Sequence, residues 1–353
     1  MSNTKKIIFI IIFLLSIIAL FFVYNDDFLY SKQIIKIIKI DTLSEEISQN
    51  SLGLEEKYYT KKITGIITNG KQKGNKKTIS YDESYSSVVT DKYKVNDKLI
   101  LDASGIELKR DFYLTIMIVV FLNLLYIVGS YKGLLSVLSI FLNLVIFYIG
   151  LSLYFKDINL LFLCVIEMII FSIISLILSS GLNKKTLSAI LSVIISTLIM
   201  LVILIIIVNF NGYNGINFNE LSFLTVPIED IILPELLIGS TGAIMDVAIT
   251  ISSSISELIQ KDNNISVKNL KKSAREIGKD IMSTMSNVLF FTYLCSGLPI
   301  FVLALRNGFS MYNYISSNFT LELTRFLIGS IGIVLTIPVS AHVSIKLMKR
   351  GAK

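Results

Sequence analysis

Residues Leu187 to Asn209 read LSAILSVIISTLIMLVILIIIVN, a run with no charged side chain. An α-helix rises about 1.5 Å per residue and the hydrocarbon core of a bilayer is about 30 Å thick, so this run is long enough to span a membrane. Similar runs fill most of the chain after Asp111. The expected spans there are Tyr113–Ser130, Gly133–Tyr154, Ile158–Gly181, Leu187–Asn209, Ile232–Gln260, Ile281–Leu305 and Phe326–Leu347. We therefore expect residues 111–353 to form a seven-helix transmembrane domain.

The composition is typical of a membrane protein. The 353 residues are 53% hydrophobic and 17% charged, with a mean hydropathy of +0.70. Soluble domains carry about a quarter charged residues. The formal charge of +7 is compatible with nucleic acid or with a membrane surface. Because the basic residues lie in loops beside apolar runs and form no single patch, we expect a lipid bilayer and no nucleic acid as partner.

The first apolar run, Ile7 to Tyr24, follows Lys5 and Lys6 and resembles a secretory signal. It is about as long as a spanning helix requires, and no small-x-small cleavage pattern precedes Asn25. We therefore interpret residues 1–24 as an uncleaved N-terminal membrane anchor. The expected fold is then mainly α: a polytopic membrane helix bundle of about eight transmembrane helices.

Residues 25–110 differ from the rest of the chain. Between Tyr24 and Arg110 there are 15 Lys or Arg and 13 Asp or Glu, with short β-like runs between polar turns. The candidate strands are residues 34–40, 62–68, 77–81, 86–90 and 98–102, and the turn signals are residues 70–74 and 96–97. Five short strands predict a small β-rich domain, either a barrel or a sandwich. Residues 44–59 are too polar to assign.

Lys and Arg in short loops indicate the orientation, because they accumulate on the cytoplasmic side. With a cytoplasmic N-terminus, 15 of them fall on that side and only three, Lys156, Arg306 and Arg325, fall in the opposite short loops. The 15 are Lys5, Lys6, Lys132, Lys184, Lys185, Lys261, Lys268, Lys271, Lys272, Arg275, Lys279, Lys346, Lys349, Arg350 and Lys353. The bias predicts a multi-pass protein of the cell membrane with both termini cytoplasmic and residues 25–110 extracytoplasmic.

The span Ile232–Gln260 carries the densest group of polar residues inside an apolar segment. Polar side chains in the hydrocarbon core are costly, so they indicate function or contacts between helices. Steps of three and four residues place one set on a single helical face: Glu235, Gly239, Gly242, Asp246, Thr250, Ser253 and Glu257. An ionised Asp246 near the helix centre would need a cation, water or a polar partner, and would otherwise be protonated at neutral pH.

The next span carries a second polar stripe, formed by Asp280, Thr284 and Asn287. The segment 267–277 before it has apolar residues at helical spacing and basic residues on its other faces. It resembles an amphipathic helix on the cytoplasmic surface, or else a solvated connector. Because the connection is short, we expect the two helices to be antiparallel neighbours, with Asp246 facing the bundle interior near Asn287. Asp246 then either couples transport to a proton or cation, or is a structural acid bonded across the bundle.

Glu167, in the middle of the span Ile158–Gly181, is a second candidate for ion coupling, although no polar stripe surrounds it. His342 has no companion ligand, and Cys164 and Cys295 lie in apolar runs, so we expect neither a metal site nor a disulfide. The chain has no phosphate-binding loop, zinc-protease helix or nucleophile elbow. We therefore expect no enzyme activity, no catalytic residue and no cofactor. An intramembrane enzyme is the least favoured alternative.

Two segments resemble the YibE/F family of multi-spanning bacterial membrane proteins. The matching residues are Pro234-Glu235, Gly242 to Ser254 (GAIMDVAITISSS), Glu257-Leu258 and Gly278 to Asn287 (GKDIMSTMSN). Lys279 and Ser286 are mild departures from the family pattern, Lys for Arg and Ser for Thr. The resemblance implies an anchor, an outer domain and a helical block over nearly the whole chain, and it transfers no reaction or catalytic residue.

The motif helix, the amphipathic segment and the Ser/Thr-rich helix are also similar, more distantly, to the SecD/SecF and resistance-nodulation exporters. That similarity would imply a proton-driven machine. In this chain, however, extra spans precede the motif, and one chain supplies only a single half of such an exporter. The similarity therefore concerns the fold alone. The leading hypothesis is a transporter or transport-associated protein that moves a small ion or solute and couples to a proton or cation through Asp246. The alternative is a non-transporting scaffold whose outer domain binds an envelope protein.

Overall fold

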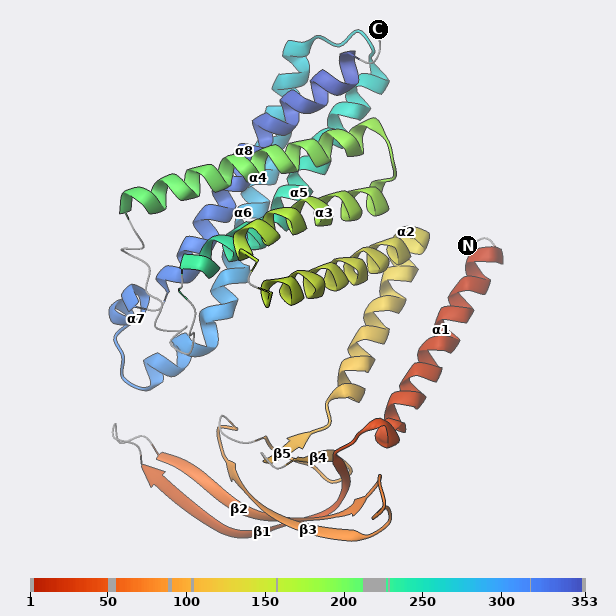
Figure 1. Ribbon diagram of the computed structural model, residues 1–353, viewed down its shortest axis with the longest axis vertical. Coiled ribbons are helices and arrows are strands. Elements are labelled where there is room, and N and C mark those ends of the chain that lie inside the picture. Colours follow the sequence, from red (N-terminus) through yellow and green to blue (C-terminus); the bar gives the residue numbers. More distant parts are fainter. Residues whose placement is uncertain are drawn as a thin grey trace. The chain divides into compact units, whose positions relative to one another are not determined.

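The computed structural model describes residues 3–49, 55–87, 91–102, 105–156, 158–211, 227, 229–317 and 319–350. The chain divides into two compact units, Met1–Leu134 and Leu135–Lys353. The first unit contains an N-terminal helix, a β-sheet and the first part of a long helix (Figure 1). The described part of the second unit is helical.

Seven helices in the described residues are long and apolar enough to cross a membrane. They are α1 (Asn3–Tyr24), α2 (Asp111–Tyr154), α3 (Leu160–Ser180), α4 (Lys184–Asn211), α5 (Glu229–Lys261), α6 (Val267–Arg306) and α8 (Thr320–Arg350). The 3-10 helix η1 (Asp26–Leu29) follows α1, and the short α7 (Met311–Ser317) precedes α8. Each expected span lies largely within one of the long helices. α6 begins 14 residues before the expected span Ile281–Leu305, because segment 267–277, expected as an amphipathic surface helix or a solvated connector, continues directly into that span. The prediction of a mainly helical protein with membrane-spanning candidates is confirmed.

Two of the eight expected spans lie in the single helix α2. Its backbone leaves the helical region at Ser130, where φ is 52° and ψ is −131°, so two helical parts meet at a sharp break. The carbonyl oxygen of Leu125 approaches Gly133 so closely that any side chain at position 133 would collide with it. The expected count of eight separate helices thus becomes seven in the described residues, because no loop separates the second and third spans.

The described strands form one antiparallel sheet in the order β3-β2-β1-β4-β5. They are β1 (Gln33–Gln49), β2 (Glu55–Ile67), β3 (Lys76–Ser84), β4 (Lys98–Asp102) and β5 (Gly105–Leu108). The expected barrel or sandwich is wrong, because the described strands make a single open layer with β3 and β5 as its edges. The expected strand at residues 86–90 is also wrong where it is described: Ser86 and Ser87 lie in a turn, and residues 88–90 lie outside the described residues.

Of the polar residues 44–59, residues 44–49 belong to β1 and residues 55–59 to β2, and residues 50–54 lie outside the described residues. The paired residues run from Ile35 opposite Ile67 to Gln49 opposite Glu55. β3 pairs with β2 only as far as Tyr58, so the end of the hairpin projects beyond the third strand as a two-stranded arm. Charged cross-strand pairs such as Lys57 with Glu45, 2.9 Å apart, replace the apolar alternation that would mark a strand in the sequence.

One face of the sheet forms a small hydrophobic core. Ile35 and Ile37 of β1, Ile63 of β2 and Leu99 of β4 are at most 1% exposed. Successive side chains of a strand point to opposite faces, so residues two apart bury together. Because a slip of one residue would expose all of them, this core holds the strand register.

A network of buried charges joins the sheet to α1 and α2. Its centre is Lys109, whose side chain is 2% exposed. The Lys109 ammonium group contacts the carboxylates of Asp26, Asp27 and Asp111, at 3.3 Å for Asp27 and 3.0 Å for Asp111. Lys98 contacts Asp27 at 2.8 Å. Burial alone would lower the pKa of Lys109, but its hydrogen bonds to Asp26 and Asp111 hold that pKa above its ordinary value. Lys109 therefore stays charged and ties the three elements together.

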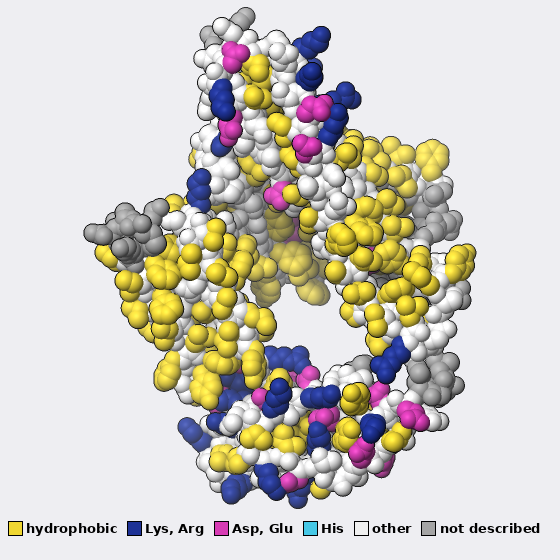
Figure 2. All heavy atoms as spheres, turned by 180° about the vertical axis from the view of Figure 1, so that it is seen from behind, with side chains coloured by type: hydrophobic (Ala, Val, Ile, Leu, Met, Phe, Trp, Pro, Cys, Tyr) yellow, Lys and Arg dark blue, Asp and Glu magenta, His cyan; other side chains and the backbone are white. Residues whose placement is uncertain are grey.

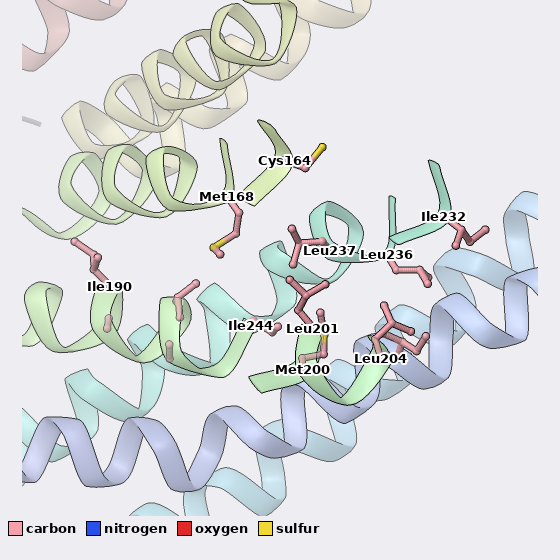
Figure 3. Packing of buried hydrophobic residues seen from close by; sticks show 14 of the residues in the cluster. Cys164, Met168, Ile190, Met200, Leu201, Leu204, Ile232, Leu236, Leu237 and Ile244 are labelled. Carbon is pink, nitrogen blue, oxygen red and sulfur yellow. The ribbon is translucent and has the colours of Figure 1, made fainter. Parts of the chain in front are cut away.

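Helix α5 is central to the second unit, since it packs against α3, α4, α6 and α8. Figure 3 shows side chains of α3, α4 and α5 meeting on one side of it, among them Met168, Leu201 and Leu237. A second cluster joins α5 to α6 and α8 through Val247, Leu289 and other buried residues. These two clusters cover much of the α5 surface and leave one face of the helix outside the packing.

A row of buried hydroxyl groups lines the contact between α4, α5 and α8. The Ser344 hydroxyl oxygen lies 3.0 Å from that of Ser188 and 2.9 Å from that of Ser252, so one serine from each helix takes part. Further buried hydroxyl residues follow at steps of four along α4 and α8: Ser192, Ser196, Thr336 and Ser340. Small side chains of this kind let helices approach closely in a membrane.

Candidate functional site

The polar face of α5 is the candidate site. We use this term for the seven residues Glu235, Gly239, Gly242, Asp246, Thr250, Ser253 and Glu257. None of them is fully buried, whereas Val247 and Ala248 beside Asp246 are 0% exposed. The expected grouping on one helical face is therefore present in α5, and that face is the one left out of the two hydrophobic clusters.

The carboxylate of Asp246 makes no hydrogen bond or ion pair with any described residue, and its side chain is exposed. Near it, the Thr250 hydroxyl donates to the Asp246 backbone carbonyl at 2.7 Å and so does not occupy the carboxylate. A Cβ added at Gly242 would have no atom within 4 Å, so the space beside Asp246 is open. Among the described residues, the Asp246 carboxylate is thus free to take a proton, a cation or an external partner.

The Glu235 end of the polar face is closed by an ion pair between helices. Arg325 of α8 contacts Glu235 at 2.5 Å and also pairs with Glu322 of its own helix. Tyr293 of α6 lies over the next position, since its hydroxyl oxygen would be 3.0 Å from a Cβ added at Gly239. These contacts hold α5, α6 and α8 together at this end.

The Glu257 end opens into a cavity of about 460 Å³. Ser253, Ser256 and Glu257 of α5 line it together with Lys184 and Lys185 at the start of α4. Figure 2 shows Lys and Arg side chains gathered at this end of the second unit. We call it the basic end, the end at which α4 and α6 begin and α5 and α8 finish. The polar face therefore meets a polar, charged opening at one of its two ends.

Asp246 was expected to face the bundle interior near Asn287, but both side chains are exposed, and no hydrogen bond between the two is present in the described residues. The reason lies in the packing of α6. Its Gly278 and Leu289 face α8, where Gly278 contacts Ile337. Asn287 is two residues from Leu289 and so lies on the other side of the helix.

The second expected stripe follows the same pattern. Asp280, Thr284 and Asn287 are all exposed along one face of α6. The Thr284 hydroxyl is used within the helix, since it donates to the backbone carbonyl of Ile281 at 3.0 Å. α5 and α6 are neighbours, as expected, and Tyr293 of α6 lies beside Gly239 of α5.

Glu167 lies apart from the polar face, in α3, and is 5% exposed. Its carboxylate presses against the backbone of α2 at Gly150, where any side chain would collide with it. No hydrogen bond or ion pair to Glu167 comes from the described residues. A glycine at position 150 leaves room for the Glu167 carboxyl group, which is buried and makes no hydrogen bond or ion pair with the seven residues of the polar face.

Comparison with known proteins places the chain in a family. Residues 117–350 match the model of YibE/F-like protein, and residues 28–118 match that of the YibE/F family N-terminal domain. The chain belongs to the YibE/F family. In this YibE/F protein the first match contains every residue of the polar face, and the second contains the sheet. No curated protein and no solved structure matches the chain.

Sequence reasoning missed two features of this YibE/F protein. One is Arg325, which was counted only as a loop cation although it pairs with Glu235 across helices. The other is the row of buried hydroxyl groups. Its signal was present in the sequence as Ser188, Ser192 and Ser196, spaced by four inside an apolar run. His342 is exposed, and the described residues contain no group of three or more His, Cys, Asp or Glu placed to hold a metal.

Proposed function

We propose that this YibE/F protein is a transporter of a small ion or solute, coupled to a proton or cation through Asp246. One observation carries the proposal: the polar face of α5 runs from Glu235 to Glu257 without entering either hydrophobic cluster. At 1.5 Å per residue these positions are about 33 Å apart, close to the thickness of a hydrocarbon core. One helix thus presents a polar track as long as the membrane is thick.

The chemistry of the track supports coupling. A carboxylate in a medium of low polarity is strongly disfavoured unless it is protonated or neutralised by a cation. Asp246 has neither a basic nor an amide partner among the described residues, so its own protonation or cation binding must supply that neutralisation. The cavity at the basic end reaches Ser253, two helical turns from Asp246, and offers a route for water and ions.

The orientation in the proposal follows from the charge bias. The basic end carries Lys184, Lys185, Lys261, Lys268 and Lys349, and Lys349 donates to the backbone carbonyl of Ile265 there. Basic residues near the ends of spans favour the cytoplasm. On this basis the cavity opens toward the cytoplasm, and residues 25–110 lie outside the cell.

The test is a flux screen with the purified full-length protein in proteoliposomes. Gradients of H⁺, Na⁺, K⁺ and Mg²⁺ are imposed in turn and movement is followed with ion-sensitive dyes inside the vesicles. We expect flux of at least one cation with the wild type and its loss in Asp246→Asn, because an amide cannot release a proton or neutralise a cation. Expression and thermal stability should stay near wild type, since the carboxylate has no described partner to lose.

Asp262→Asn is the matched control. Asp262 is an exposed aspartate just beyond the end of α5, so this variant removes the same charge away from the polar face. Its flux should equal that of the wild type. Full flux in Asp246→Asn across the pH range, or no flux of any cation in the wild type, would end the coupling hypothesis.

The scaffold remains the second candidate because of the two-stranded arm. Ile47 on this arm and Leu43, which precedes the arm on β1, are each 58% exposed, an unusual place for large apolar side chains. If the protein is a scaffold, a photoreactive residue in place of Ile47 should cross-link one envelope protein in intact cells, whereas one in place of Lys71 should not. That result, together with an inactive flux screen, would favour the scaffold over the transporter.

A further inference from the structure

A cavity of about 400 Å³ lies within the first unit, directly beside the end of α1. Tyr24 and Phe28 bound it on the side of the helix. On the side of the sheet it is lined by Lys36 of β1, Lys73 of the turn between β2 and β3, and Lys98 of β4. Three strands or turns that are distant in sequence therefore each direct a lysine to one opening at the end of a candidate membrane helix.

The charges in this cavity are not balanced. Asp27 also lines it, but this carboxylate is already paired with Lys98 at 2.8 Å and with Lys109 at 3.3 Å. The side-chain ammonium groups of Lys36 and Lys73 make no hydrogen bond or ion pair with any residue that the structure describes. The lining therefore has three cations and one anion, and two of the cations are available to an anionic ligand. The size of the opening is in the range of small-molecule sites.

The surroundings of the cavity are those of a membrane surface. α1 ends at Tyr24, so the residues that follow it lie at the level of the lipid headgroups if α1 spans the bilayer. Phe28 is 69% exposed and Leu29 is 61% exposed, and Phe28 stacks edge to face on Phe22 of α1. These apolar side chains suit acyl chains, while the lysines suit a phosphate group above them.

We propose that this cavity binds the headgroup of an anionic phospholipid, with Lys36 and Lys73 contacting the phosphate. The site is independent of Asp246 and of any transported substrate. A free phosphate ion would satisfy the lysines, but it would leave Phe28 and Leu29 exposed to water. The lipid uses both parts of the site, and this is why the lipid is the occupant proposed here.

The experiment is a native mass-spectrometric titration of the full-length protein in detergent micelles. Phosphatidylglycerol, phosphatidylcholine and inorganic phosphate are each added to the wild type. The pocket variant carries Lys36→Gln and Lys73→Gln. The matched control carries Lys77→Gln and Lys94→Gln, which remove two exposed lysines of the same unit outside the cavity. Lys36→Arg with Lys73→Arg keeps the charge and tests whether the pocket variant fails only through its charge.

We expect one tightly bound phosphatidylglycerol on the wild type, the control and the arginine variant, with weaker binding of phosphatidylcholine. Each basic residue near an anionic lipid contributes about fivefold in affinity, so the pocket variant should bind phosphatidylglycerol about 30-fold more weakly. Equal losses in the pocket and control variants would show unspecific attraction and overturn the proposal. The proposal would also be overturned if phosphatidylcholine bound as tightly as phosphatidylglycerol, if millimolar inorganic phosphate displaced the lipid, or if the wild type retained no phosphatidylglycerol.

Discussion

At the scale of single residues, two glycines of the second unit have opposite surroundings. A Cβ added at Gly332 of α8 would lie 2.8 Å from Ile244 Cδ1 and 2.9 Å from Met200 Sδ, both of which are buried. Overpacking of this kind costs about 1–3 kcal/mol. A Cβ at Gly242 would meet nothing within 4 Å. We expect Gly332→Ala to lower the thermal unfolding temperature in detergent and Gly242→Ala to leave it unchanged. Equal unfolding temperatures for the two variants would contradict this packing.

Residue periodicity in the sequence was sufficient to place Asp246, Gly242 and Thr250 on one helical face. It could not show which way that face points. The direction in which the polar face points depends on which other surfaces of α5 pack against larger apolar neighbours. Val247 packs against apolar residues of α8, and Ile244 packs against apolar residues of α4. The contact of Glu167 with Gly150 was equally hidden, because nothing local in the sequence relates two residues on different helices.

At the scale of elements, the junction of α1, the sheet and α2 depends on Lys109. Replacing it by methionine would leave Asp26, Asp27 and Asp111 close together without their shared cation, and breaking a buried ion pair in this way costs about 3–5 kcal/mol. We expect Lys109→Met to make the sheet far more susceptible to proteolysis in urea. Lys32→Met is the control, because Lys32 pairs with Asp102 at the surface, where solvent screens the charges and the pair contributes little. Matching susceptibility curves for the two variants would count against the network.

The junction of α1, the sheet and α2 should also lose stability at alkaline pH. Burial and a hydrogen bond donated at 2.8 Å to Asp111 raise the pKa of Tyr30 from 10.0 to about 12. A group with a raised pKa stabilises the fold below its unfolded value, and that contribution disappears as the pH rises through the folded value. The junction should therefore hold to about pH 10 and weaken toward pH 12. The difference in tyrosinate absorbance between the wild type and Tyr30→Phe should have its midpoint near 12, and a midpoint near 10 would show that Tyr30 is unbonded.

Elements whose apolar residues form a long run or recur at a regular spacing were predictable from the sequence, and elements without such a pattern were not. Each long apolar run lies within a long helix, because about 20 consecutive apolar residues form a strong and continuous signal; only α6 extends well beyond its run. Residues 44–49 and 55–59 were left unassigned because cross-strand charge pairs and main-chain hydrogen bonds, and no apolar pattern, hold these parts of β1 and β2 together. The sequence also did not predict the open shape of the sheet, because a pattern of short strands does not show whether the edge strands β3 and β5 pair with each other.

At the scale of the whole molecule, the charge bias predicts the sides of the membrane. Cysteines replacing Lys261 and Lys349 should be shielded from a membrane-impermeant thiol reagent in intact cells, and one replacing Lys71 should be labelled. Cys164 and Cys295 must first be replaced by serine, because Cys295 is exposed. Labelling at Lys349 from outside would overturn the assignment of the last helix. Permeabilised cells, in which all three positions react, supply the control for accessibility.

Family and general architecture could be read from the sequence because they rest on long segments. The contacts that join the parts could not. Arg325 with Glu235, and Ser344 with Ser188 and Ser252, connect helices that are far apart along the chain. Such pairs become apparent only when helices α4, α5, α6 and α8 are placed in space.

Helix α6 has a mechanical consequence. Its 40 residues make a rod about 60 Å long, twice the depth of a hydrocarbon core. The rod is held to α8 at several points, from Gly278 beside Ile337 to Leu289 beside Gly329 and Phe290 against Phe326. A helix held at several points along its length moves together with its neighbour as one stiff body. We therefore expect a displacement of its basic end to shift α6 and α8 together, and with them Tyr293, whose hydroxyl group lies beside Gly239 of the polar face.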